Sequence, residues 1–86
     1  MRLFLTVKTW KEGKHYIAYT PELDIASQGK NIEHAEKRLN EAVNIFLEEV
    51  KSKGALKDIL KSLGFLKTDK KWRSPRVSFS EMEMQV

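Results

Sequence analysis

The chain of 86 residues contains no cysteine, only two prolines and four glycines, and no apolar run long enough to cross a bilayer. The absence of cysteine excludes disulfides, thiolate metal ligands and cysteine nucleophiles. A membrane-spanning helix needs roughly 20 consecutive apolar residues. The first residues, Met1-Arg2-Leu3-Phe4, also lack the pattern of a signal peptide. We therefore expect a cytoplasmic protein that has no membrane contact.

Convergent catalytic side chains are lacking as well. His15 and His34 are far apart in the sequence, and no carboxylate or cysteine lies at metal-ligand spacing from either one. We expect His34 to be a solvated residue in the first turn of a helix. Most of the acidic residues fall on the exposed face of the long helix, and Glu22 and Asp24 fall in a loop, whereas a divalent metal needs several converging oxygen ligands. The sequence therefore predicts no catalytic residue, no metal and no cofactor.

The chain is instead rich in charge that is unevenly distributed. Charged residues make up 33% and hydrophobic residues 41% of the sequence, which is typical of one globular domain. A domain of this size buries only about two-thirds of its unfolded surface, so self-association commonly completes its core. The net charge is +4, and residues 65–76 supply all of it, with five cations and one acid. Basic character is thus local.

Apolar alternation predicts three strands in the first third of the chain. Leu3, Leu5 and Val7 alternate with polar residues, which favours a strand over residues 2–9. A turn at residues 11–14 leads into a second strand over residues 15–20, which proline at position 21 should end. A short third strand near residues 25–28 would complete an antiparallel meander.

Helical periodicity follows directly. Residues 32–53 carry apolar side chains at spacings of three and four, which indicates a long amphipathic helix. Asn31 is a favoured N-cap, and Gly54 is a favoured residue just past the C-terminus. A second helix is predicted over residues 55–63, ending at Gly64.

Residues 76–86 predict a strand with a change of phase. Val77 and Phe79 share one phase, whereas Met82, Met84 and Val86 share the other. Such a shift indicates either a β-bulge or bend, or two halves that face two surfaces, one of them in a partner. We expect this segment to take part in self-association.

These elements together predict an α+β fold. One small antiparallel sheet, in the order strand, strand, short strand, helix, helix, strand, should pack on one long helix. We expect a single domain over residues 1–86, with a core at 2–64, a basic loop at 65–75 and a C-terminal strand at 76–86.

The segment in which Tyr16-Ile17-Ala18-Tyr19 runs into Pro21, and in which Ser27-Gln28-Gly29 precedes the long helix, resembles the HicB family over residues 3–50. HicB proteins are the antitoxin half of small toxin–antitoxin pairs. The positions that match the family motif are Gly13, Tyr16, Ala18, Pro21, Leu23, Ser27, Gln28, Gly29, Glu33 and Ala35. We interpret most of them as structural.

The resemblance implies a partial RNase H-like fold and a role in binding, not catalysis. A HicB antitoxin neutralises HicA, a small basic toxin that cleaves mRNA, by direct protein contact, and several form dimers or tetramers. After position 64 we expect no DNA-binding domain of the kind that many HicB proteins add. The resemblance is therefore to the short forms, for which control of transcription through DNA is doubtful.

Two alternatives stay open. Cations around an indole could contact phosphates and stack on an unpaired base; these residues are Lys67, Lys70, Lys71, Trp72, Arg73 and Arg76. The competing interpretation, which we favour, is a solvated loop whose tryptophan packs on the core. The other alternative is a stand-alone oligomeric HicB-like protein with a role that its sequence does not disclose.

Overall fold

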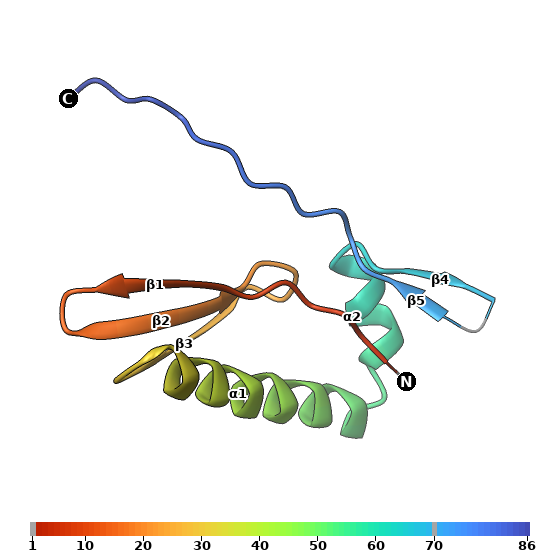
Figure 1. Cartoon of the computed structure of the whole chain (residues 1–86). Helices are drawn as coiled ribbons and strands as arrows, with labels where there is room; N and C mark the ends of the chain where they lie inside the picture. The colour runs from red at the N-terminus through yellow and green to blue at the C-terminus, as the bar shows by residue number, and fades with distance from the viewer. Residues whose placement is uncertain (1, 70) are drawn as a thin grey trace.

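A three-stranded antiparallel sheet and a long helix pack together as two layers and form the first part of the fold. In the computed structural model, which describes residues 2–69 and 71–86, the sheet contains β1 (Lys8–Glu12), β2 (His15–Thr20) and β3 (Ile25–Gly29) in the order β1-β2-β3. Helix α1 (Ile32–Ser52) lies along one face of this sheet (Figure 1). The predicted α+β class is confirmed.

The second part of the fold lies beyond the far end of α1. Helix α2 (Leu56–Ser62) is followed by a small antiparallel hairpin of β4 (Leu66–Thr68) and β5 (Lys71–Arg73). The prediction of a loop over residues 65–75 is therefore wrong, because six of these residues pair as strands. The apolar pattern of these six strand residues is weak, because Trp72 is the one buried side chain among them.

Strand β2 is central, and its side chains alternate as predicted. Ala18 and Thr20 are fully buried on the face toward α1, while Tyr16 on the same face is half-buried. Gly13, with a φ of +61°, supplies the left-handed conformation in the turn between β1 and β2. Strand β2 ends at Thr20, as expected from the missing N–H of Pro21.

The predicted strand over residues 2–9 begins only at Lys8. In the β1–β2 register Lys8 lies opposite Tyr19, so two residues earlier Thr6 would lie opposite Pro21, where β2 has already ended. Residues 2–7 therefore run as an unpaired extended arm. Leu3 and Leu5 pack on the core from this arm, which explains the alternation without a strand partner.

Both ends of α1 have the caps that the sequence predicts. The Asn31 side chain accepts a hydrogen bond from the His34 N–H at 2.7 Å, and Gly54 has a φ of +70° just past the C-terminus. Ala35, Leu39 and Val50 form the buried stripe. No helix in the described residues is both long enough and apolar enough to cross a membrane.

The sheet approaches the helix closely at Gly29. A Cβ at this position would lie 2.5 Å from the backbone nitrogen of Ala35 and 2.8 Å from the carbonyl carbon of His34. Real Cβ atoms do not come so near to backbone atoms, so only glycine fits here. Gly29 thereby lets β3 lie directly against the first turn of α1.

The core consists of two clusters. One is small and lies between sheet and helix, around Ala18, Ala35 and Leu39. The other lies at the α2 end, and its buried members are Leu23, Leu60, Phe65 and Trp72. Ile25 and Val43 contact both clusters and so connect the two parts of the fold.

The C-terminal segment does not form a strand within this chain. Residues 74–86 have no regular structure, and Figure 1 shows them leaving the β4–β5 hairpin and extending away from both layers. The predicted strand, and with it the β-bulge, is therefore not formed by intrachain pairing. The radius of gyration is 15.0 Å, whereas a compact chain of this length would have about 12 Å.

Candidate functional site

The extended C-terminal segment, residues 77–86, carries several of the exposed large apolar side chains in the described residues. Phe79 is 60% exposed and Met82 is 79% exposed, and Met84 and Val86 are also exposed. Only Val77 is half-buried. Near its start the segment passes β1, where the Lys8 ammonium lies 6.0 Å from the centre of the Phe79 ring. This segment offers side chains that a partner surface could cover.

Its backbone is also available. Residues 77–86 have no strand partner in the described chain, and β1 is an edge of the sheet. An unpaired extended segment and an open sheet edge both present backbone N–H and C=O groups for pairing with another chain. The sequence prediction of an interaction segment is consistent with this placement, and self-association itself stays a prediction.

The predicted nucleic-acid residues separate into two groups. Lys67, Lys71, Arg73 and Arg76 are exposed, whereas Trp72 is only 9% exposed and belongs to the core cluster around Phe65. The indole therefore packs inward, in line with the favoured interpretation, and is not free to stack on a base. Lys70 lies outside the described residues.

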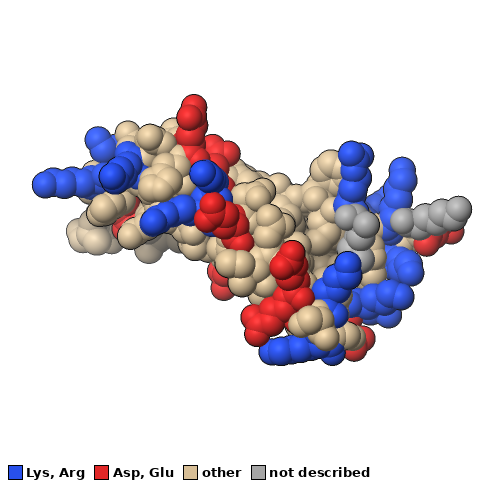
Figure 2. All heavy atoms as spheres, turned by 90° about the horizontal axis from the view of Figure 1, so that it is seen from below, with Lys and Arg blue, Asp and Glu red and all other residues tan. Residues whose placement is uncertain are grey.

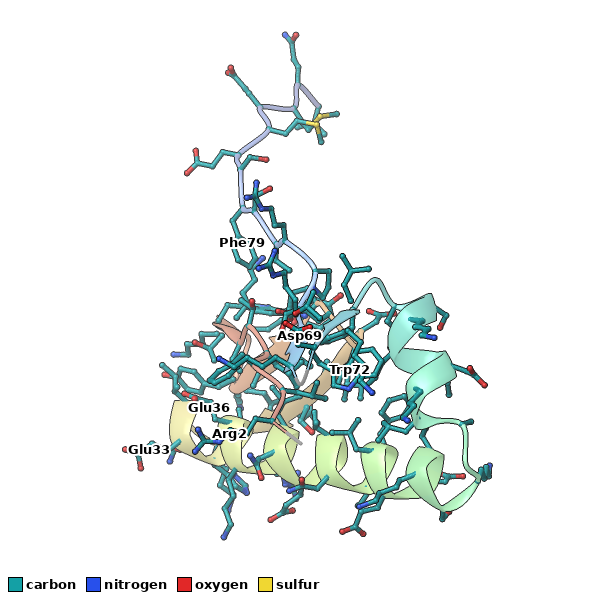
Figure 3. All side chains as sticks on the ribbon, turned by 90° about the vertical axis from the view of Figure 1, so that its right-hand side faces the viewer. Arg2, Glu33, Glu36, Asp69, Trp72 and Phe79 are labelled. Atoms are coloured by element: carbon teal, nitrogen blue, oxygen red, sulfur yellow. The ribbon has the colours of Figure 1, made fainter. Side chains whose placement is uncertain are left out.

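A pocket of about 620 Å³ opens beside this hairpin. Its lining comes from the N-terminal arm, α2, β4, β5 and the connecting turn, and consists of Arg2, Phe4, Lys57, Lys67, Asp69, Lys71 and Trp72. Figure 3, which looks toward this end of the molecule, labels Arg2, Asp69 and Trp72 among them. Sequence reasoning missed Arg2, Phe4 and Lys57, because the fold brings them to the hairpin from distant parts of the chain.

Charged side chains gather at the same end. In Figure 2 lysines and arginines gather at the right, over α2 and the β4–β5 hairpin, and a second group lies at the left end of the view. Along α1 both signs are present instead, with Glu33 and Glu36 labelled in Figure 3. Exposed acids and bases alternate there; they are Glu33, Glu36, Lys37, Arg38, Glu41, Glu48, Glu49, Lys51 and Lys53. A continuous acidic surface is therefore not formed on α1.

A buried carboxylate that the sequence did not single out joins the N-terminal arm to the β2–β3 turn. The Thr6 N–H donates to both carboxylate oxygens of Glu22, at 3.0 and 2.9 Å, and the Thr6 hydroxyl donates at 2.7 Å. The Thr20 hydroxyl donates to the same group at 3.2 Å. These donors replace the strand partner that the arm lacks, so Glu22 positions Leu3 and Leu5 on the core.

Two opposing influences act on the pKa of Glu22. Burial of the carboxyl acts to raise it, but hydrogen bonds from Thr6, Thr20 and the Glu22 N–H outweigh this effect and lower the pKa below its ordinary value of 4.5. In the same turn, the Tyr19 hydroxyl donates to the Asp24 carboxylate at 2.8 Å, which raises the pKa of Tyr19.

The family-motif positions lie mainly in the sheet–helix junction. Ala18 and Ala35 are fully buried, Leu23 is in the larger core cluster, and Gly29 permits the close approach described above. Among the other positions, Gln28 and Glu33 are exposed, while Tyr16, Pro21 and Ser27 are half-buried. These positions hold the fold and do not converge on one reaction centre.

The histidines do not form a site with other side chains. His34 is not the simple solvated residue that we expected, because its Nδ1 accepts a hydrogen bond from the Lys30 N–H at 3.1 Å while its own N–H is bound by Asn31. It therefore completes the cap of α1. His15 is exposed at the start of β2. Within the described residues, no group of three or more His, Cys, Asp or Glu could hold a metal ion.

The comparisons with known proteins give no relative for this chain: no protein-family model, no curated protein and no solved structure matches it.

Proposed function

We propose that this chain is a HicB-like antitoxin that binds a small HicA-type, mRNA-cleaving toxin by direct protein contact. The observation that carries the proposal is the C-terminal segment, in which four apolar side chains are exposed on a backbone without a strand partner in the described chain. Such a segment suits a protein partner, because burying it would remove apolar surface from water and satisfy backbone groups together.

The motif positions support the same proposal indirectly. Ala18, Leu23, Gly29 and Ala35 have clear packing roles in a three-stranded meander that lies on one long helix. These four of the ten positions that match the HicB motif thus have a packing role in this arrangement. The motif supports the fold, and the exposed C-terminal segment supports binding of a partner. The proposed antitoxin function rests on the C-terminal segment.

Affinity capture of the tagged chain from its source cells, with nuclease treatment as a control, tests the proposal. We expect a small basic protein at near one-to-one ratio, insensitive to nuclease. The recovered protein should cleave RNA when purified alone, and adding the chain in equal amount should suppress cleavage. A recovered partner without ribonuclease activity, or one that still cleaves RNA in the complex, would refute the antitoxin role.

A matched variant identifies the surface that binds. Replacing Phe79, Met82 and Met84 by serine keeps the length of the segment and removes most of its apolar area. This variant should lose the partner, whereas serine at the exposed Ile45 of α1 should retain it. Equal binding by both variants would show that the contact lies elsewhere on the molecule.

The segment also fits a second copy of the chain. We propose that the protein forms a homo-oligomer, a dimer or tetramer, through residues 77–86. An edge strand and an unpaired segment in each copy provide complementary backbone groups, and methionine side chains adapt well to such contacts. Binding of a toxin does not exclude binding of a second copy, because the side chains on the two alternation phases of residues 77–86 can face different surfaces.

A further inference from the structure

Cations from separate parts of the chain surround the pocket beside the β4–β5 hairpin. Arg2 comes from the N-terminal arm, Lys57 from α2, Lys67 from β4 and Lys71 from β5, with Asp69 as the acid in the lining. Four positive charges and one negative charge leave the lining with a net charge of +3. Arg2 and Lys57 come from outside the basic stretch at residues 65–76. The fold therefore adds these two cations to those that the stretch itself places around the pocket.

Within the described residues, these cations have no ion-pair partner. Within the part of the chain that the structure describes, the ion pair present joins Lys53 and Glu49 on α1, and none of the pocket cations is paired. Charges of one sign held around a hollow repel one another and create a positive potential there. An anionic ligand would relieve this repulsion, and the pocket volume is in the range of sites that hold one nucleotide-sized group.

The pocket also contains an accessible aromatic ring. Phe4 is 74% exposed although it lines the pocket, whereas the neighbouring Trp72 is buried. The Ser74 hydroxyl donates a hydrogen bond to the Phe4 carbonyl and so fixes this part of the arm next to the end of β5. An exposed ring among cations is the combination that stacks on an unpaired base while its phosphates are bound.

We propose that this pocket binds single-stranded nucleic acid, with phosphates contacting Arg2, Lys57, Lys67 and Lys71 and one base stacked on Phe4. A duplex does not fit this arrangement, because its bases are already stacked on one another. A strand fits better than a free nucleotide, because exposed cations continue beyond the pocket at Arg73 and Arg76. The proposal is independent of the antitoxin role, since it uses neither the C-terminal apolar residues nor a protein partner.

Binding of a labelled single-stranded RNA of about 12 nucleotides, followed by fluorescence anisotropy across a salt series, provides the test. The variant K57A/K67A/K71A should reduce the slope of log affinity against log salt by about 2, because each lost phosphate contact on a single strand contributes about 0.7. At 0.1 M salt this corresponds to roughly 100-fold weaker binding. The control K11A/K14A/K30A loses the same charge from exposed sites near the opposite end of the sheet and should change affinity only a few-fold.

A second variant separates base stacking from charge. Phe4→Leu removes the ring at an exposed position, so the fold should be retained, which circular dichroism checks. It should weaken oligonucleotide binding by about tenfold and leave binding of inorganic polyphosphate, which has no bases, unchanged. A proportional loss for both ligands would overturn the stacking part of the proposal.

The remaining outcomes also decide the matter. The proposal is refuted if the wild-type chain does not bind the oligonucleotide at low salt, or if the lysine control loses as much affinity as the pocket variant. Duplex binding equal to single-strand binding would indicate a nonspecific polyanion surface and overturn it. If a mononucleotide at equal concentration displaced the oligonucleotide, the ligand of the pocket would be a small nucleotide and not a strand, which would overturn the proposal.

Discussion

Glu22 is a buried carboxylate whose charge is stabilised by hydroxyl and N–H donors, with no cation paired to it in the described residues. At the residue scale, it connects an arm without strand partners to the β2–β3 turn. A charged group so placed makes stability depend on pH, because the donors favour the ionised form.

Acid should therefore weaken the fold through Glu22. Its folded-state pKa is below the ordinary value of 4.5, so the stabilisation is fully present above pH 4.5 and is lost as pH falls through the folded-state value. Glu22→Gln should cost about 1–3 kcal/mol at pH 7, because an amide cannot satisfy the same donors, and should flatten the stability curve below pH 4.5. Urea unfolding at pH 7 and pH 3.5 measures both effects.

Glu36→Gln, on the exposed face of α1, is the matched control and should have little effect at either pH. If the Glu22 variant kept the same acid dependence as the wild type, the hydrogen-bonded carboxylate would not be its source.

Gly29 and Gly13 are needed for different physical reasons. Gly29→Ala should cost about 2–3 kcal/mol, because its Cβ would collide with the backbone of α1 at 2.5 Å. Gly13→Ala meets no atom within 4 Å and should cost about 1 kcal/mol from its positive φ alone. Thermal unfolding of both variants compares the two costs, and a larger loss at Gly13 would contradict the close-packing argument.

At the scale of elements, the sequence predicts the helices and strands whose hydrophobic pattern is long and whose apolar face packs on one neighbouring element. The 21-residue α1, with its Asn31 and Gly54 caps, and β2 before Pro21 are where the pattern placed them. The alternation at residues 2–7 predicts a strand because it indicates an extended backbone with one apolar face. It does not indicate whether another strand lies beside that backbone. The same limit applies to residues 76–86.

The hairpin and its pocket were harder to predict. Strands β4 and β5 have three residues each, and their buried member is Trp72, so no periodicity can develop. Asp69, with a φ of +49°, occupies the turn, and aspartate in a turn is a weak signal by itself. The pocket depends on Arg2 and Phe4 reaching the hairpin through tertiary packing, which no local pattern encodes.

Helix α2 should depend on packing for its existence. Seven residues are too few for a stable isolated helix, and Leu60 is fully buried against the larger cluster. Leu60→Ala should cost about 2–5 kcal/mol, whereas Leu66→Ala, at a leucine that is 63% exposed, should stay within about 0.5 kcal/mol. Chemical denaturation of the two variants measures the difference, and similar losses would mean that α2 does not rely on this contact.

At the scale of the whole molecule, the proposed self-association through residues 77–86 can be tested separately from folding. Residues 78–86 are exposed, so deleting residues 77–86 should leave the single-chain fold intact and convert the oligomer to a monomer. Light scattering gives the mass, and circular dichroism with thermal unfolding checks the fold. An unchanged oligomer would refute the self-association proposal, and an unfolded monomer would show that the segment also supports the chain that carries it.

The two tryptophans lie at opposite ends of the described structure, Trp10 on the edge strand β1 at 37% exposure and Trp72 within the α2-end cluster at 9%. Their indoles should therefore emit at different wavelengths, the buried one further to the blue. Replacing Trp10 by Phe would leave Trp72, which lines the basic pocket, as the single tryptophan of the chain. The protein thus contains its own optical probe for events at the hairpin, and no external label is needed.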